Sequence, residues 1–151
     1  MKKLFLLAIL LFISGKEVKA ELSQYTITDE YEARLTSYYP KKPVSPTGCG
    51  LGIEDFGVNE YGWYTYKGKL VIATATNYLL NYGWRYQNGV RLYNYYDILI
   101  LNINGVDYEA IVLDSCGICM TTGRIDLFVV DKDAVIDTMI IVKEVVNDEM
   151  V

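Results

Sequence analysis

Short runs of alternating apolar and polar residues fill most of the chain after residue 30, and this period of two is typical of β-strands. No long stretch has the period of an amphipathic helix. Six segments have the composition of strands: Glu32–Tyr39, Lys69–Thr76, Tyr96–Ile103, Val106–Asp114, Arg124–Val130 and Met139–Val146. We therefore predict an all-β domain.

Two features in the middle of the chain predict how these strands are arranged. Asn104-Gly105 separates two of them and is the strongest short-range signal for a β-hairpin. The continuous apolar runs Ile98–Leu101 and Ile111–Leu113 indicate strands buried on both faces, which a closed barrel or a tight sandwich accommodates. Two short helical turns are expected, one capped by Asp131 and one within Asn77–Trp84.

The first 20 residues have the pattern of a secretory signal peptide. Lys2 and Lys3 precede an apolar run from Leu4 to Ile13, and small residues stand at Val18 and Ala20. The alternative is an uncleaved membrane tether, although the run is shorter than the roughly 20 residues that span a bilayer. We expect cleavage after Ala20, which leaves residues 21–151 as a single secreted domain, extracellular or associated with a cell wall.

Charge and composition exclude several classes of function. Removal of the leader leaves 10 basic and 18 acidic residues, a net charge of −8, so nucleic acid is not an expected partner. No basic amphipathic helix or second long apolar run is present, so we expect no stable membrane insertion. The chain has no histidine, which excludes serine–histidine and cysteine–histidine nucleophiles and histidine-ligated zinc.

The three cysteines have alternative interpretations. Cys116 and Cys119 have the Cys-x-x-Cys spacing of thiol–disulfide oxidoreductases, but no helix is predicted after them to activate a thiolate. In an exported protein, a structural disulfide is the competing interpretation. We expect Cys49 to pair with Cys116 or Cys119, leaving one free thiol. Such a bridge would close a long loop and contribute on the order of 4 kcal/mol.

Two aspartates flank the Cys-x-x-Cys segment, and both lie next to apolar runs. In a structural interpretation, Asp114 caps a turn and Asp126 pairs with Arg124 on the surface. In a functional interpretation, both carboxylates lie at one rim of the barrel, and one acts as a general acid/base. The residue pattern alone does not favour either.

Tyrosines and clustered aspartates add little further chemistry. The 14 tyrosines suit half-buried strands, although an exposed aromatic strip would also stack against sugar rings. Asp131, Asp133 and Asp137 lack the spacing and the glycine of a calcium loop, and three cysteines without histidine are too few for zinc. We expect no metal and no cofactor.

Four blocks of sequence resemble one known superfamily. These blocks are, in order, ARLTSYYP, GCGLG, KGKLVIATAT and AIVLDSCGIC…GRIDLF, and they resemble the secreted double-psi β-barrel proteins. That superfamily includes the three-aspartate domain of bacterial lytic transglycosylases, rare lipoprotein A and the expansins. The resemblance covers about Ala33 to Val146. It implies a six-stranded double-psi β-barrel with one or two short helices.

The resemblance also implies site residues. Asp114 and Asp126 occupy the positions of two family aspartates, and Thr36 and Tyr38 match the opening strand and would bind substrate. The third family aspartate has no assigned position. The implied activity is that of a peptidoglycan lytic transglycosylase, which cleaves the β-1,4 bond between N-acetylmuramic acid and N-acetylglucosamine. Asp126 would be the acid/base, with Asp114 orienting it or stabilising charge, or with the two roles reversed.

Two functions of different classes remain open. The first is a monomeric enzyme whose partner is peptidoglycan or another cell-wall glycan. The second is a non-catalytic, expansin-like module that binds peptidoglycan or another polysaccharide. A secreted barrel that binds only a protein partner is a third alternative.

Overall fold

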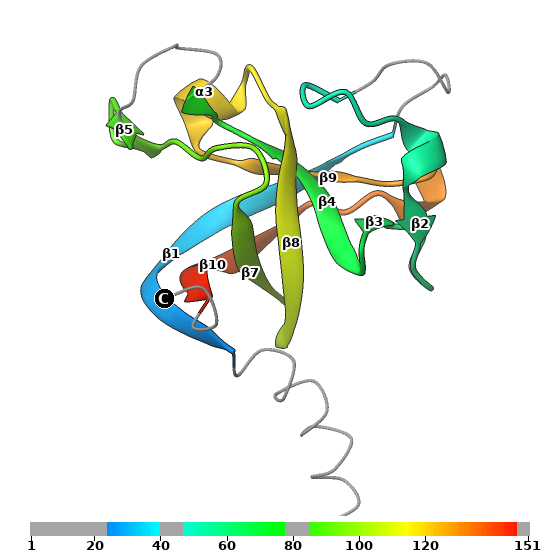
Figure 1. Ribbon diagram of the computed structural model, residues 1–151, viewed down its shortest axis with the longest axis horizontal. Helices are drawn as coiled ribbons and strands as arrows, with labels where there is room; N and C mark the ends of the chain where they lie inside the picture. The colour runs from blue at the N-terminus through cyan, green and yellow to red at the C-terminus, as the bar shows by residue number, and fades with distance from the viewer. Residues whose placement is uncertain (1–23, 40–46, 78–84, 148–151) are drawn as a thin grey trace, which may run out of the picture.

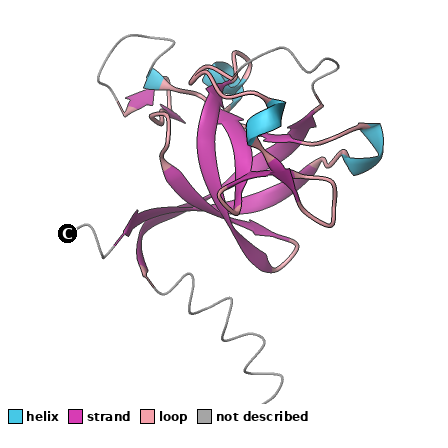
Figure 2. Ribbon diagram, turned by 45° about the vertical axis from the view of Figure 1, so that its right-hand side comes forward, coloured by secondary structure: helices cyan, strands magenta, loops and turns pink. Residues whose placement is uncertain are grey.

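The computed structural model describes residues 24–39, 47–77 and 85–147 of the 151-residue chain. The predicted signal peptide lies outside these residues. All but the first residue of the predicted helical turn at Asn77–Trp84 lies outside them as well. Strands make up most of the described part (Figures 1 and 2).

All six predicted strands are present. They are β1 (Tyr25–Tyr38), β4 (Lys69–Thr74), β7 (Ile98–Ile103), β8 (Val106–Ser115), β9 (Ile125–Phe128) and β10 (Thr138–Asn147). β1 begins seven residues earlier than predicted, because the segment before it also pairs with β10. Four shorter strands accompany them: β2 (Gly57–Val58), β3 (Tyr64–Tyr66), β5 (Tyr86–Gln87) and β6 (Val90–Arg91).

The six long strands close into a barrel. Their order is β4-β8-β7-β10-β1-β9, and β9 pairs back to β4, so this ring of strands has no free edge. β1 with β9 and β4 with β8 are parallel pairs, and the other four pairs are antiparallel. The prediction of an all-β, closed six-stranded barrel is therefore confirmed.

The barrel has an internal symmetry of connection. In chain order, the barrel strands form two groups of three: β1, β4, β7 and β8, β9, β10. If β1 is exchanged with β8, β4 with β9 and β7 with β10, every strand pair maps onto an observed pair, and parallel and antiparallel pairs are conserved. The parallel pair β1–β9 becomes β8–β4, and the hairpin β7–β8 becomes the pair β10–β1. Each half of the chain therefore supplies three strands in an equivalent arrangement.

Alternation along the strands separates two apolar layers. The inner layer receives side chains from all six long strands, including Leu35, Ile72, Val112, Leu127 and Val142. The outer layer lies against β4, β8 and β9, where the segment from Cys49 to Tyr66 and the Cys116–Cys119 turn cover it. Strands β7 and β8 are buried on both faces along their predicted apolar runs, except that Ile98 is only half-buried, and β4 is buried on both faces as well.

Three short features complete the fold. Asn104 and Gly105 both have positive φ, at 52° and 86°, as the turn of a tight hairpin requires. The Asp131 side chain accepts a hydrogen bond from Asp133 N at a 3-10 turn, Lys132–Ala134, so the predicted cap is confirmed for a shorter element. A one-turn helix, α3 (Cys119–Thr122), follows the Cys-x-x-Cys segment. The expectation of no helix there is wrong, because one turn is too short to produce a helical period.

Candidate functional site

Strand register aligns the two candidate aspartates in one row across the barrel wall. Ala73 of β4 pairs with Asp126 of β9 on one side, and Asp126 pairs in turn with Thr36 of β1. On the other side, a β-bulge between Ile72 and Ala73 brings Asp114 of β8 opposite Ala73. Asp114 and Asp126 are thus two strand spacings apart, about 10 Å between their Cα atoms.

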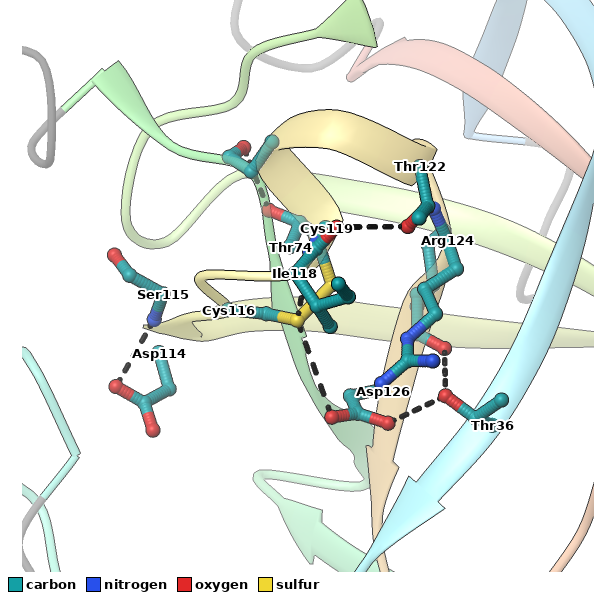
Figure 3. The surroundings of a disulfide bond; sticks show 12 residues. Thr36, Thr74, Asp114, Ser115, Cys116, Ile118, Cys119, Thr122, Arg124 and Asp126 are labelled. Carbon is teal, nitrogen blue, oxygen red and sulfur yellow. Dashed lines mark hydrogen bonds between the residues drawn. A yellow bond between two sulfur atoms is a disulfide. The ribbon is translucent and has the colours of Figure 1, made fainter.

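Asp126 points away from the barrel interior and keeps one carboxylate oxygen open. Its neighbours Ile125 and Leu127 belong to the inner layer, so alternation places Asp126 on the outer face. Asp126 Oδ1 accepts a hydrogen bond of 2.6 Å from Thr36 Oγ1 (Figure 3). Within the described chain, no N–H or O–H group donates to Oδ2. The structural alternative of an Asp126–Arg124 ion pair does not form there.

Asp114 has a different environment. Its Oδ1 accepts two backbone hydrogen bonds, one of 2.8 Å from Gly48 N and one of 2.9 Å from Ser115 N. The first of these fixes a loop to the end of β8. Gly48 cannot carry a side chain here, since a Cβ atom would lie 2.0 Å from the Tyr95 hydroxyl. Asp114 therefore has the contacts of a residue that anchors a loop.

A disulfide joins Cys116 to Cys119, and the expected bridge from Cys49 is wrong. The two cysteines lie on one tight turn with their Cα atoms 5.1 Å apart, which suits a disulfide. The Cys49 thiol instead donates a hydrogen bond of 3.0 Å to Leu113 O. Both bonded sulfurs belong to buried residues, which disfavours thiol exchange.

The disulfide lies between the two aspartates (Figure 3). Cys116 Sγ is 4.0 Å from Asp126 Oδ2, and as a disulfide sulfur it carries no hydrogen to donate. Both half-cystines pack in the outer layer together with Ala73, the residue that separates the aspartates in the row. The two carboxylates are close in register but do not face each other directly.

Tyr38 lies one row beyond Thr36 on the same face. It pairs with Phe128 in the parallel β1–β9 register, and the two rings meet edge to face with centroids 5.4 Å apart. The Tyr38 side chain is 45% exposed. The predicted residues Thr36 and Tyr38 therefore lie near Asp126. Thr36 is hydrogen-bonded to its carboxylate, and Tyr38 presents an exposed ring.

A cluster of hydroxyl groups lies next to Asp114, and residue patterns did not indicate it. Ser115 Oγ is hydrogen-bonded to the Tyr95 hydroxyl at 2.8 Å and to Thr76 Oγ1. Thr76 is fully buried although it is polar, and this pairing satisfies its hydroxyl. The cluster fixes the end of β8, and its Tyr95 hydroxyl also lies against Gly48.

Three cavities of the described chain contain neither aspartate. They have volumes of about 740, 350 and 240 Å³ and are lined by other residues. A polymer can bind along a surface without an enclosed pocket, so a site at Asp126 does not require a cavity. The 740 Å³ cavity borders a buried charge network instead.

That network centres on Glu144, which is only 4% exposed. Its carboxylate is bound by Arg85, by Arg91 at 3.2 Å and by the Tyr93 hydroxyl at 2.8 Å. Burial raises the pKa of Tyr93, so the phenol stays protonated and donates. A sequence signal was available, since Glu144 is in phase with Ile140 and Val142, which point into the barrel.

The described residues contain no cluster of cysteine, aspartate and glutamate side chains suited to hold a metal ion. None of the helices in the described ranges is long and apolar enough to cross a membrane. Compared with family models, with curated proteins and with solved structures, the chain gives no match.

Proposed function

We propose that this chain is a secreted double-psi β-barrel protein that cleaves peptidoglycan as a lytic transglycosylase. Asp126 is the acid/base of this reaction. Its carboxylic acid protonates the glycosidic oxygen between N-acetylmuramic acid and N-acetylglucosamine as the C1–O bond breaks. The resulting carboxylate then takes the proton of the muramic 6-hydroxyl, whose oxygen bonds to C1 and gives a 1,6-anhydro product.

The fold supports the superfamily assignment. A closed six-stranded barrel with two parallel strand pairs, and with halves that exchange by symmetry, is compatible with a double-psi barrel. The segments that resemble the superfamily form the strands next to the site, since β1, β4, β8 and β9 carry Thr36, Ala73, Asp114 and Asp126.

One observation carries the catalytic proposal. Asp126 presents a half-buried carboxylate on the outer face, with Oδ1 oriented by Thr36 and with no donor to Oδ2 within the described chain. An acid/base must reach the proton that it transfers, and a carboxylate oxygen that accepts no hydrogen bond is available for that proton. The exposed Tyr38 ring beside it offers a surface for a sugar ring.

The contacts of Asp114 favour a mechanism with a single acid/base. Asp114 is two strands away from Asp126, accepts two backbone hydrogen bonds, and has the disulfide between itself and Asp126. Attack by the substrate's own hydroxyl needs no second carboxylate.

The test is incubation of the purified protein with isolated peptidoglycan, followed by mass spectrometry of the soluble products. We expect 1,6-anhydro muropeptides from the wild type. Asp126→Asn should lower their rate of formation by about 10²–10⁴-fold, the usual contribution of general acid–base catalysis. Asp133→Asn, at an exposed turn, is the matched control and should retain the wild-type rate. Full activity of Asp126→Asn contradicts the assignment.

The second candidate is a non-catalytic barrel of expansin type that binds wall polysaccharide. The observation in its favour is that none of the three cavities above is lined by Asp126, while Tyr38, Tyr39 and Tyr61 are exposed aromatic side chains. Co-sedimentation with peptidoglycan in the absence of anhydro products would favour this candidate.

A further inference from the structure

Three arginines from separate parts of the chain line a single cavity. It has a volume of about 350 Å³ and lies between β1, β6 and the segment that joins α3 to β9. Arg34 comes from β1, Arg91 from β6, and Arg124 directly precedes β9. We call it the arginine cavity. Glu32 is the one acidic side chain among its lining residues.

Two of the three guanidinium groups are already neutralised. Arg34 makes a bidentate pair with Asp137, with N–O distances of 2.8 and 2.6 Å. Arg91 lies 2.6 Å from Asp29 and 3.2 Å from Glu144. These two arginines therefore have fixed partners within the fold.

Arg124 has no such partner within the described residues. It forms no ion pair there, and its Nε atom is buried without a hydrogen-bond acceptor. The pKa of Asp137 is lowered mainly by hydrogen bonding from Arg34, and the charge of Arg124 lowers it only slightly. A buried guanidinium N–H without an acceptor is unfavourable, and an acceptor-bearing ligand would remove that cost.

The tyrosines of the cavity do not oppose an anion. The Tyr31 and Tyr93 hydroxyls are 2.5 Å apart, and Tyr93 donates to Glu144, so Tyr31 is the donor to Tyr93. Burial, as the main cause, raises the pKa of Tyr31 to about 12. Both rings therefore remain neutral at physiological pH and contribute no negative charge to the cavity.

The cavity also lies close to Asp126. Arg124 directly precedes β9, and Asp126 is the second residue of that strand. Figure 3 shows the Arg124 side chain extending toward Asp126. A ligand group bound at Arg124 would therefore hold the rest of its molecule within reach of the Asp126 carboxylate.

We propose that the arginine cavity is a carboxylate-binding subsite in which the Arg124 guanidinium binds a carboxylate of the substrate. This inference rests on the proposed function, because it identifies the carboxylate as one carried by the peptide attached to the muramic acid. A guanidinium fork matches a carboxylate with two parallel hydrogen bonds. The cavity volume is at the lower end of the range for small-molecule sites, which suits a single amino-acid residue.

The experiment is isothermal titration calorimetry of the purified protein with two matched probes. One is N-acetylmuramyl-L-alanine, which carries a free carboxylate, and the other is the same compound with its carboxylate converted to an amide. The acid should bind at least about tenfold more tightly than the amide, because the charge-assisted pair is lost in the amide. Equal binding of acid and amide overturns the proposal.

Variants locate the carboxylate. Arg124→Gln should reduce binding of the acid to the level of the amide, and Arg124→Lys should fall between, because it keeps the charge and loses the fork. Lys132→Gln removes one positive charge from an exposed turn outside the cavity and should bind the acid as the wild type does. A thermal melt of each variant confirms folding. If Lys132→Gln weakens binding as much as Arg124→Gln, only overall charge matters and the subsite is excluded.

Asp126→Asn separates this inference from the proposed function. It should bind the acid as the wild type does and release no anhydro products. If the wild type cleaves peptidoglycan but shows no preference for the acid, the subsite fails and the function stands. If Arg124 governs binding of the acid but the wild type yields no anhydro products, the subsite stands and the catalytic proposal fails.

Discussion

Asp114 and Asp126 lie in the same row of the barrel wall, on either side of Ala73, yet they hold different groups. Asp114 Oδ1 accepts two backbone hydrogen bonds, and the one from Gly48 N fastens the Gly48 loop to the end of β8. Asp126 Oδ1 accepts one hydrogen bond, from the Thr36 side chain, and holds no backbone group. Position in the sheet therefore does not decide the role of a carboxylate here.

The difference lies in which groups each carboxylate holds. Asp114 accepts from two backbone N–H groups, and its removal leaves both donors without a partner. Asp126 accepts only from the Thr36 hydroxyl, so the backbone does not depend on it and its carboxylate is available to exchange a proton with a ligand. The comparison predicts that loss of Asp114 affects stability and that loss of Asp126 affects activity.

The largest stability effect is expected at Glu144, which is the extreme case of a satisfied carboxylate. Glu144→Gln should lower the free energy of unfolding by about 3 kcal/mol, because it removes the charge that Arg85 and Arg91 neutralise inside the fold. Urea denaturation measures this loss. Asp137→Asn breaks the Arg34 pair, in which both side chains are more than half exposed, and should cost much less. Equal losses of unfolding free energy in Glu144→Gln and Asp137→Asn would contradict the expectation that the buried carboxylate matters more for stability than the exposed one.

Asp114→Ala should lower the free energy of unfolding by about 2 kcal/mol. The substitution removes the acceptor of both the Gly48 and the Ser115 backbone N–H groups. Hydrogen exchange should show faster exchange of the Gly48 amide, and peptidoglycan cleavage should fall less than about tenfold, since Asp114 takes no part in proton transfer. Wild-type stability together with complete loss of cleavage would mean that the roles of the two aspartates are reversed.

Removal of the disulfide should have an effect of similar or smaller size. The Cys116→Ser/Cys119→Ser double variant should lose on the order of 2 kcal/mol, because a bridge across three residues closes only a short loop. The protein can be denatured without a reductant, alkylated and analysed by peptide mapping. Only Cys49 should be modified, because it is the free cysteine. If Cys116 or Cys119 is modified and Cys49 is not, the disulfide joins Cys49 to the other of these two cysteines, as the sequence suggested.

Thr36 provides the smallest and most local test. Thr36→Val removes the hydroxyl that orients Asp126 and should slow cleavage by less than about tenfold, the value of one hydrogen bond. Thr36→Ser keeps the hydroxyl and should recover most of the rate. If Thr36→Ser is as slow as Thr36→Val, the hydroxyl does not position the carboxylate.

The strands could be predicted because their signal is local. A period of two and the Asn-Gly turn identified all six strands and their hairpin. The apolar runs indicated either a closed barrel or a tight sandwich, and the family resemblance implied the six-stranded barrel. The parallel β1–β9 pair, which brings Thr36 to Asp126, joins segments about 90 residues apart, and only the family resemblance placed both residues in one site.

The rest depended on contacts between distant segments. Cysteine pairing depends on the distance between Cα atoms in the fold, and no sequence pattern shows that Cys116 bonds to Cys119 while the Cys49 thiol donates to Leu113 O. The arginine cavity likewise forms from three separate strands or loops. Glu144 is the exception, since its alternation with Ile140 and Val142 predicts an inward charge that needs a cationic partner.

The most direct test compares Asp126→Asn and Asp114→Ala with the wild type. For each protein it measures the yield of 1,6-anhydro muropeptides and the midpoint of thermal unfolding. The account predicts a crossed result. Asp126→Asn should keep the wild-type midpoint and lose the product, whereas Asp114→Ala should lower the midpoint and keep the product. Asp126→Asn that still forms anhydro products at the wild-type rate would contradict the account.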